Sequence, residues 1–188
     1  MRELSKQFFT AAAILVLGCS GLQVSQDYDP KADFSGLGTF AWKSEDQPRT
    51  GDIRVDNPLL DARIRAAVER ALTDRGFRKV AGGAPDFAVS YAFQIRRKID
   101  SERVRTSIGF GSGGGGSFGG VGVSTGGGVS EYDEGMLVID LTKPDDSHLL
   151  WRGTGTRRIS QRSNPEQITA EVDETVDKIL SQFPPPAK

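Results

Sequence analysis

The sequence predicts an α+β fold, in which an antiparallel sheet of about four to five strands carries two helices on one face as a two-layer sandwich. Residues 131–156 alternate in polarity on both sides of a polar turn, which is typical of a β-hairpin. Residues 87–95 alternate with an unusually regular period of two. Residues 57–76 and 164–183 carry apolar side chains at steps of three and four, as amphipathic helices do.

The first eighteen residues are predicted to be a targeting segment that does not belong to the fold. Arg2 and Lys6 form a short basic region, and residues 8–18 form an apolar run. This run is far shorter than the roughly 20 residues that a membrane-spanning helix needs. It ends in Gly18-Cys19, which resembles the lipobox of bacterial lipoproteins. We therefore expect a signal peptide over 1–18 and lipidation of Cys19, with an ordinary secretory peptide cut nearby as the alternative.

Lipidation would determine both the cellular location of the protein and its attachment to the membrane. Several buried acyl chains anchor a protein stably, whereas a single chain does not. Ser20 follows the cysteine, where an aspartate would resemble an inner-membrane retention signal. We expect a lipid-anchored domain of the cell envelope, at the outer membrane and facing the periplasm. Residues 19–32 would then comprise the lipidated cysteine and a tether.

The rest of the chain is predicted to form one domain over residues 33–183, followed by a proline-rich tail over 184–188. Its first strand is expected within residues 34–42, where alternation places two aromatic residues on one face. Residues 44–56 are polar and contain proline and glycine, which indicates a surface loop.

Both helices have clear start signals. Asn57 is a good N-cap and Pro58 suits the first helical position, while Gly76 is the expected stop. The second helix repeats the Asn-Pro start at Asn164, and Gln167 stands where it would complete a capping box.

The strand over 87–95 is predicted to pair with the first strand of the hairpin. Val89 opposite Ile139, and Tyr91 opposite Leu137, would place both apolar sets on the same face. This register centres the connection on Gly114, and a slip of two residues would preserve the same faces.

The connection contains an unusual glycine tract over residues 109–128, with 12 of the 23 glycines of the chain. It formally matches a dinucleotide-binding fingerprint, but such a match is trivial where glycine is so frequent, and no helix start follows it. We expect a flexible hairpin tip. The functional alternative is that Phe110 and Phe118 contact a partner or a membrane.

Several motifs, taken in order, resemble those of the domain-of-unknown-function family 4136. They are Asp27-Tyr28-Asp29 with Asp33-Phe34, residues 39–42, residues 85–91, residues 135–140 and residues 150–153. The resemblance covers residues 27–183, and Met136 departs from the threonine expected there. Members of this family look like bacterial envelope lipoproteins, and the resemblance implies no catalytic residues.

Few residues offer catalytic or metal chemistry. His148 is the only histidine and Cys19 the only cysteine, so a His- or Cys-based metal site and a disulfide are not expected. His148 is expected to be a solvated turn residue. Asp29 and Asp33, if close to Asp140, could serve a carboxylate-based hydrolase, although acids on turns are more often caps. No cofactor is expected.

A basic cluster has two interpretations. It consists of Arg96, Arg97, Lys98, Arg103 and Arg105, and Arg157 and Arg158 would extend it if they lie nearby. These residues could bind lipid phosphates or another partner, or they could protect sheet edges from pairing with other chains. Trp42 and Trp151 stand at the ends of apolar strands and are predicted to be core residues.

The net charge of −1 gives no reason to expect a nucleic-acid partner. Our first functional hypothesis is a non-enzymatic envelope lipoprotein that binds or scaffolds another envelope component, such as an envelope protein. The second is a carrier or sensor of a small apolar or anionic ligand held between sheet and helices. The third is the carboxylate-based hydrolase.

Overall fold

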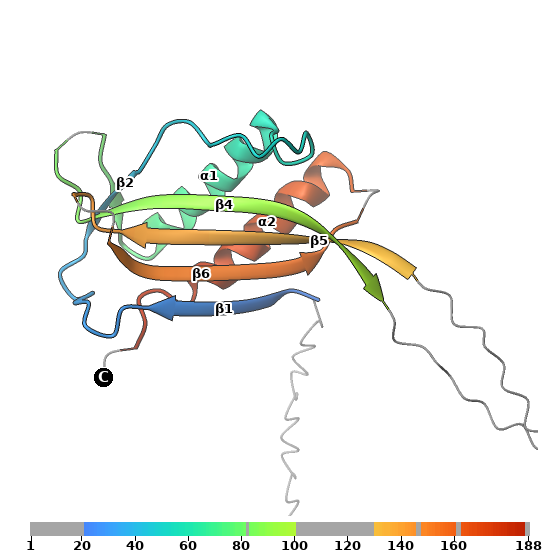
Figure 1. Ribbon diagram of the computed structural model, residues 1–188. Coiled ribbons are helices and arrows are strands. Elements are labelled where there is room, and N and C mark those ends of the chain that lie inside the picture. Colours follow the sequence, from blue (N-terminus) through green and yellow to red (C-terminus); the bar gives the residue numbers. More distant parts are fainter. Residues whose placement is uncertain (1–20, 82, 101–129, 146–147, 161–162, 187–188) are drawn as a thin grey trace, which may run out of the picture.

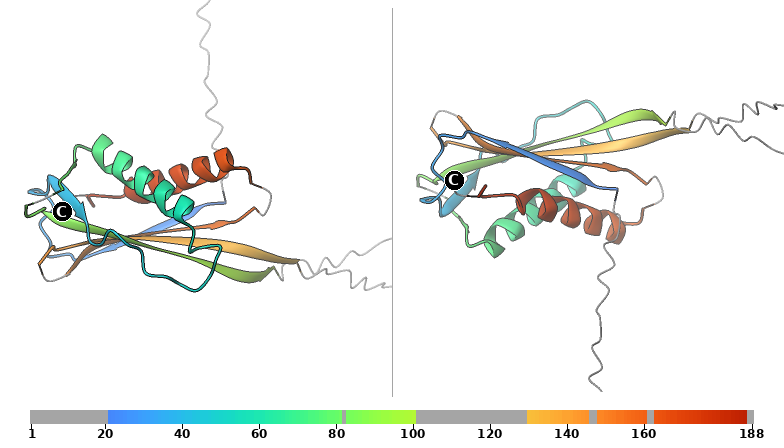
Figure 2. Two further views of the ribbon diagram at one scale, coloured as in Figure 1. Left: turned by 90° about the horizontal axis from the view of Figure 1, so that it is seen from above. Right: turned by 90° about the horizontal axis from the view of Figure 1, so that it is seen from below.

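The computed structural model describes residues 21–81, 83–100, 130–145, 148–160 and 163–186. Six strands and two helices lie within these ranges. In chain order they are β1 (Gln23–Tyr28), β2 (Thr39–Trp42), α1 (Pro58–Asp74), β3 (Arg78–Lys79), β4 (Phe87–Asp100), β5 (Ser130–Thr142), β6 (Leu149–Arg158) and α2 (Pro165–Leu180). The strands form one sheet in the order β1-β6-β5-β4-β2-β3, and both helices cover one of its faces (Figures 1 and 2).

The α+β class is confirmed, but the prediction of a purely antiparallel sheet of four to five strands is wrong. The sheet has six strands and is mixed, because β2 pairs in parallel with both β3 and β4. Parallel strands need a crossover connection. Helix α1 provides it between β2 and β3, and β3 is too short to be recognised from its two residues, Arg78 and Lys79.

The segment expected to be a tether contains the edge strand β1. It pairs antiparallel with β6, with Val24 opposite Gly155 and Tyr28 opposite Trp151. Most of β1 is polar and exposed, so its alternation is weak in the sequence. Gln26 is nevertheless anchored, because its Oε1 accepts a hydrogen bond of 2.9 Å from Trp151 Nε1.

The predicted strand over 34–42 is also shorter than expected. Only Thr39–Trp42 is extended, because the residues before it form a turn. Asp33 stabilises this turn by accepting hydrogen bonds from the backbone N and the Oγ of Ser35. Local side-chain to backbone bonds of this kind compete with strand formation.

The register of β4 and β5 differs from the prediction by two residues. Val89 lies opposite Leu141 and Tyr91 opposite Ile139, so the inward and outward faces are those predicted but the partners are not. This register lets the ladder continue from Ala88–Thr142 to Asp100–Ser130. The glycine tract that joins the two strands lies outside the described residues.

Both helices begin as predicted. Asn57 Oδ1 accepts a hydrogen bond of 2.9 Å from the backbone N of Leu59. Asn164 and Gln167 form a reciprocal capping box with bonds of 2.8 and 3.0 Å. At the end of α1, Gly76 has a φ of +91°, a conformation that favours glycine.

The two helices run in the same direction. Arg63, early in α1, donates a hydrogen bond to Thr169, early in α2. Arg75, just after α1, reaches the carbonyl of Asp177 near the end of α2. The N-termini of both helices therefore lie at the same end of the sandwich.

The other end of the sandwich is closed by aromatic rings, and we call it the aromatic end. It contains Phe40, Phe77, Phe87, Trp151 and Phe183, all of them buried. The Phe183 ring lies 5.3 Å from Phe77, 5.9 Å from Phe87 and 5.4 Å from Trp151. Trp151 is thus a core residue, as predicted. Trp42 is only partly buried and packs against the edge of the core.

Helix α2 approaches β6 closely because Gly153 has no side chain. A Cβ at this position would lie 2.3 Å from Trp151 Cη2 and 2.4 Å from Ile179 Cγ2. The space that a side chain would take is thus filled by the indole ring and by the helix.

Candidate functional site

We call the opposite end, where β1 and both helices begin, the open end. A hollow of about 740 Å³ and another of about 530 Å³ reach it or lie beside it. The smaller one lies between the sheet and the two helices, and we call it the wedge. Its apolar lining consists of Leu60, Ile64, Phe93, Ile95, Leu137, Ile159, Ile168 and Val172.

Two inward-facing positions of the sheet that line the wedge are glycines. Gly135 on β5 and Gly155 on β6 both line it. A Cβ on Gly135 would lie 2.9 Å from Ile159 Cδ1 and 3.2 Å from Phe93 Cε2. The ends of these two side chains therefore cover the backbone of β5 at this position. Glycine inside a strand often marks a place where another group comes close to the backbone.

Four arginines line the wedge, and their partners differ. Arg54 pairs with Asp133 at 3.3 Å, and Arg157 pairs with Glu174 at 3.3 Å. The Nε of Arg157 is buried and has no hydrogen-bond partner among the described residues. The guanidinium of Arg63 meets only the Thr169 hydroxyl, at 3.1 Å, and no carboxylate of the described chain forms an ion pair with it.

The fourth arginine, Arg97, is exposed and 3.7 Å from Glu131. Two carboxylates, Asp133 and Glu171, belong to the lining as well. Glu171 lies 4.0 Å from Arg157. The wedge is therefore an apolar hollow with a polar border on which arginines outnumber carboxylates.

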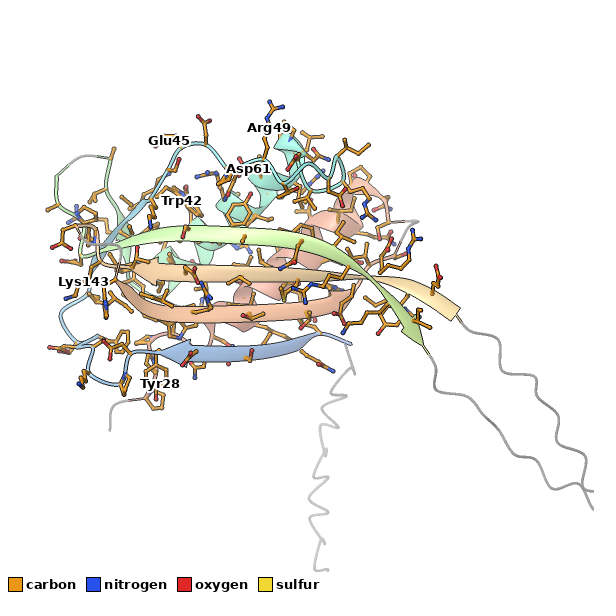
Figure 3. The ribbon with its side chains drawn as sticks, viewed as in Figure 1. Tyr28, Trp42, Glu45, Arg49, Asp61 and Lys143 are labelled. Carbon is orange, nitrogen blue, oxygen red and sulfur yellow. The ribbon has the colours of Figure 1, made fainter. Side chains whose placement is uncertain are left out.

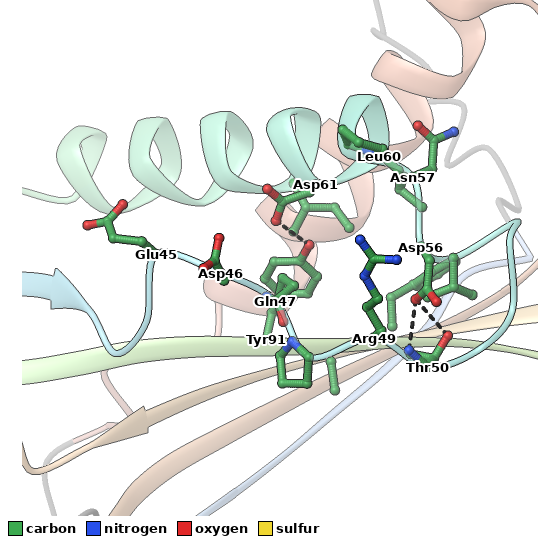
Figure 4. Close-up of a pocket in the computed structure, with 16 residues that line it drawn as sticks. Glu45, Asp46, Gln47, Arg49, Thr50, Asp56, Asn57, Leu60, Asp61 and Tyr91 are labelled. Carbon is green, nitrogen blue, oxygen red and sulfur yellow. Dashed lines mark hydrogen bonds between the residues drawn. The ribbon is translucent and has the colours of Figure 1, made fainter.

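The larger hollow, which we call the loop hollow, lies beside the edge of β4. Strand β2 pairs with β4 only as far as Val89. The loop from Lys43 to Asn57 then runs along the edge of β4 towards the start of α1 (Figures 1 and 4). The loop hollow and the wedge share four lining residues and so adjoin each other: Asn57, Leu60, Ile64 and Phe93.

Most polar groups of the loop hollow hold its own walls together. The Tyr91 hydroxyl donates a hydrogen bond of 2.7 Å to Asp61, and burial together with this bond raises the pKa of Tyr91 far above its ordinary value (Figure 4). Arg65 bonds Asp61 at 2.9 Å and the carbonyl of Glu45 at 2.9 Å, which ties the loop to α1. Arg49 extends from the loop towards α1 (Figure 4).

Asp56 stabilises the second half of this loop. Its carboxylate accepts hydrogen bonds from the backbone N of Thr50 and of Gly51, at 2.8 and 2.9 Å. The bond from Thr50 and the other local donors lower the pKa of Asp56. We conclude that the polar groups of the loop hollow are used in hydrogen bonds that hold its loop in place. The wedge, in contrast, offers apolar space.

The basic residues singled out in the sequence lie on the part of β4 at the open end. Lys98 pairs with Glu134 at 2.8 Å, while Arg96 donates to the Gln94 side chain at 3.2 Å. Arg97, as described, lines the wedge. The other predicted contacts, Cys19, Phe110 and Phe118, lie outside the described residues, as do Arg103 and Arg105.

The three carboxylates considered for a hydrolase each have a different partner. Asp140 forms two hydrogen bonds of 2.7 Å with Arg152, and Asp33 caps its own turn. Asp29 meets His148 Nε2 at 3.0 Å, and this bond lowers the pKa of Asp29. His148 is exposed beside its turn, as predicted, but its contact with Asp29 was not foreseen. Across the described ranges, no cluster of three His, Cys, Asp or Glu side chains is suited to holding a metal ion.

Sequence reasoning did not identify the wedge. The signal that could have pointed to it is the occurrence of Gly135, Gly153 and Gly155 at inward positions of two predicted strands. Side chains of other elements approach all three glycines, and only Gly135 and Gly155 line the wedge, which is a property of the tertiary structure.

The family model for a domain of unknown function, DUF4136, matches residues 24–185. The chain belongs to this family. The match begins within β1, so the edge strand is part of the DUF4136 domain. No curated protein matches the sequence. None of the described helices is long and apolar enough for a bilayer crossing.

Solved structures with a similar fold include a PDZ domain protein from Parabacteroides distasonis, with a TM-score of 0.56 and 12% identity. The match covers 89% of this chain but only 37% of that protein. Two structures of the PelC dodecamer from Paraburkholderia phytofirmans, one of them of a single-substitution variant, match with TM-scores of 0.45 and 0.47 at 15% and 16% identity. Each PelC match covers 85% of this chain and 95% of PelC. At such low identity these similarities concern the fold alone.

Proposed function

We propose that this DUF4136 protein is a lipid-anchored protein of the cell envelope whose domain binds an amphiphile, a molecule with an apolar tail and an anionic group. The observation that carries the proposal is the wedge, with its apolar walls and arginine border. This is the second of the hypotheses drawn from the sequence, and it takes precedence over scaffolding because the wedge has the character of a ligand site. Lipidation of Cys19 and an outer-membrane location remain part of the proposal.

The size and lining of the wedge support a small ligand. Its volume of about 530 Å³ lies within the range of roughly 300–1,000 Å³ that is usual for small-molecule sites. Apolar side chains from both helices and from the sheet surround it. Burial of an acyl tail there would be favourable by about 0.8 kcal/mol for each methylene group removed from water.

The border of the wedge supports an anionic group on that ligand. Arg63 has a free guanidinium edge, since the Thr169 hydroxyl is its one partner among the described residues. A carboxylate or phosphate could accept a charge-assisted hydrogen bond from it, and such bonds are about twice as strong as neutral ones. Arg54 and Arg157 are already engaged by acidic residues, so Arg63 is the better candidate for direct contact.

The scaffolding hypothesis is favoured by a different feature, the face of the sheet opposite the helices. No helix of the described chain covers this face (Figure 2). Its side chains are largely polar, and Arg152 and Asp140 pair across it. A partner protein could dock there through polar contacts, so scaffolding remains the second candidate.

The test of the ligand proposal is titration of the purified protein with a dansyl-labelled long-chain fatty acid, followed by fluorescence. We expect Val172→Trp, which fills the wedge, to weaken binding about tenfold or more, equivalent to about 1.4 kcal/mol. The control Ala66→Trp adds the same ring on the exposed side of α1 and should bind like the parent. Thermal unfolding must show that both variants are folded.

The anionic contact is tested in the same titration with two arginine variants. Arg63→Gln should weaken binding of the fatty acid, whereas Arg70→Gln should not, because Arg70 lies two turns further along α1, pairs with Asp173 and does not line the wedge. No saturable binding to the parent, or equal binding to Val172→Trp and Ala66→Trp, would refute the proposal.

A further inference from the structure

We infer that the open end of the sandwich is the face that contacts the bilayer, so that the wedge is presented to the membrane surface. The inference rests on the lipid anchor at Cys19 that is part of the proposed function. Three features of the molecule indicate this end: the reach of the anchor, the position of exposed apolar side chains and the character of the charges.

The anchor can reach only one end of the molecule. Strand β1 starts at Gln23, opposite Thr156 at the far end of β6. Cys19 precedes Gln23 by four residues, and four residues of extended chain span at most about 14 Å. A lipid on Cys19 therefore holds the start of β1, and with it the open end, close to the membrane.

Exposed apolar side chains independently indicate the same end. Among the described residues, four large hydrophobic side chains are exposed: Val24 (38%), Ile53 (88%), Leu59 (65%) and Ile99 (62%). They come from four different segments of the chain, yet all four lie at the open end.

The neighbours of these residues establish their location. Val24 pairs with Gly155, which lines the wedge, and Ile53 precedes Arg54, which pairs with Asp133. Leu59 is in the first turn of α1.

Ile99 lies near the end of β4, opposite Glu131. Scattered exposed apolar residues need no explanation, but concentration at one end of a molecule often marks a membrane or protein contact.

The charges of the open end permit contact with lipid headgroups. Most of its cations have carboxylate partners, such as Lys98 with Glu134, so the end is not strongly charged. Arg158 instead stacks over the Tyr132 ring at 4.1 Å, and Arg96 contacts the uncharged Gln94. Exposed ion pairs contribute little, so these side chains can exchange partners for lipid phosphates at small cost.

The aromatic end has a different surface. The turn between β5 and β6 begins with Lys143, Pro144 and Asp145, all exposed, and Lys143 lies at the opposite end of the sheet from the end of β4 (Figure 3). The four exposed large hydrophobic residues of the described chain are absent from this end. Only the open end thus combines apolar contacts with the anchor.

This orientation makes the membrane the source of the ligand. Leu60 and Arg63 of the wedge follow the exposed Leu59 on α1. An amphiphile could then move between the bilayer and the wedge without crossing bulk water.

The experiment reconstitutes the full lipidated protein into vesicles of phosphatidylethanolamine and phosphatidylglycerol whose acyl chains are brominated, because bromine quenches nearby tryptophan. Leu59→Trp introduces a reporter at the open end and Lys143→Trp a matched reporter at the other end. After subtraction of the parent signal from Trp42 and Trp151, we expect loss of the Leu59→Trp fluorescence and none of the Lys143→Trp fluorescence. Adding Ile53→Asp and Ile99→Asp to Leu59→Trp should reduce the quenching.

The outcomes separate this inference from the proposed lipid anchor. Equal quenching at both ends, or stronger quenching at Lys143→Trp, overturns the orientation while the anchor stands. Failure of the lipoprotein to sediment with vesicles overturns both. A Cys19→Ala variant that sediments as well as the parent overturns the anchor alone, and the two reporters then still decide which end touches lipid.

Discussion

The two ends of this sandwich are built from the same strands and helices, but only one of them is filled. At the aromatic end the inward positions of β4, β5 and β6 are Phe87, Leu141 and Trp151, all fully buried. At the open end the corresponding positions on β5 and β6 are Gly135 and Gly155, and Phe93 of β4 is only partly buried. The two ends thus differ in the side chains that the strands contribute, and at the open end Ile159 and Ile179 instead approach the backbone at Gly135 and Gly155.

This difference suggests that the aromatic end stabilises the fold and that the open end provides the binding site. Phe183, shortly after α2, is in ring contact with Phe34, Phe77, Phe87 and Trp151 and so joins the end of the chain to both layers. These ring contacts and the buried side chains around them stabilise the aromatic end. The open end carries the wedge on the same strands and helices, and sites built on such elements are more precise than sites on loops.

The largest effect is expected from Trp151→Ala at the aromatic end. The indole is fully buried and its Nε1 donates to Gln26, so we expect a loss of about 3–5 kcal/mol in the free energy of unfolding. Phe93→Ala at the open end removes a partly buried ring and should cost clearly less. Denaturant unfolding of both variants measures the contrast, and similar losses would contradict the division into a packed and an open end.

A medium effect is expected from adding one methyl group to a glycine of β6. In Gly153→Ala the new Cβ meets Trp151 and Ile179 at 2.3 and 2.4 Å, and overpacking of this kind costs about 1–3 kcal/mol. The matched variant Gly135→Ala meets Ile159 Cδ1 at 2.9 Å, the end of a side chain that borders the wedge and can move into it. We expect Gly135→Ala to lower the melting temperature less than Gly153→Ala does. The reverse order would show that the Ile159 side chain cannot move into the wedge.

Much of this arrangement could be predicted from the sequence because it is encoded locally. The caps at Asn57 and Asn164, the stop at Gly76 and the alternation of β4 each involve neighbouring residues, and all four are confirmed. The inward and outward faces of β4 and β5 are correct for the same reason.

The predictions failed where partners distant in sequence decide. The register of β4 and β5 was wrong by two residues, because shifting by two leaves the faces unchanged and only the ladder as a whole selects between them. Strand β1 was missed since its polar residues become a strand by pairing with β6. The wedge is lined by residues of the sheet, of both helices and of the loop before α1, so it is visible only when these elements are packed together.

The smallest effect is expected from Asp86→Asn. Asp86 lies just before β4 and forms hydrogen bonds with the start of β2. Asp86 Oδ2 accepts hydrogen bonds from the backbone N of Gly38 at 3.0 Å and from the N and Oγ1 of Thr39, both at 2.7 Å. The Thr39 hydroxyl and these amides lower the pKa of Asp86, since they stabilise the charged form. A depressed carboxyl pKa contributes stability that is fully present above the unfolded value of about 3.9 and is lost as the pH falls through the folded value.

The melting temperature of Asp86→Asn should therefore lie below that of the parent at neutral pH, and the gap should close as the pH falls below about 4. Thermal unfolding at a series of pH values measures this gap. Because the carboxylate is exposed, water weakens its contribution and the gap should be smaller than that of either core variant. A gap that stays constant down to the lowest pH would mean that the geometry of the amide, and not the lost charge, separates the variant from the parent. The bond between Asp86 and β2 would then have to be treated as an ordinary neutral turn contact.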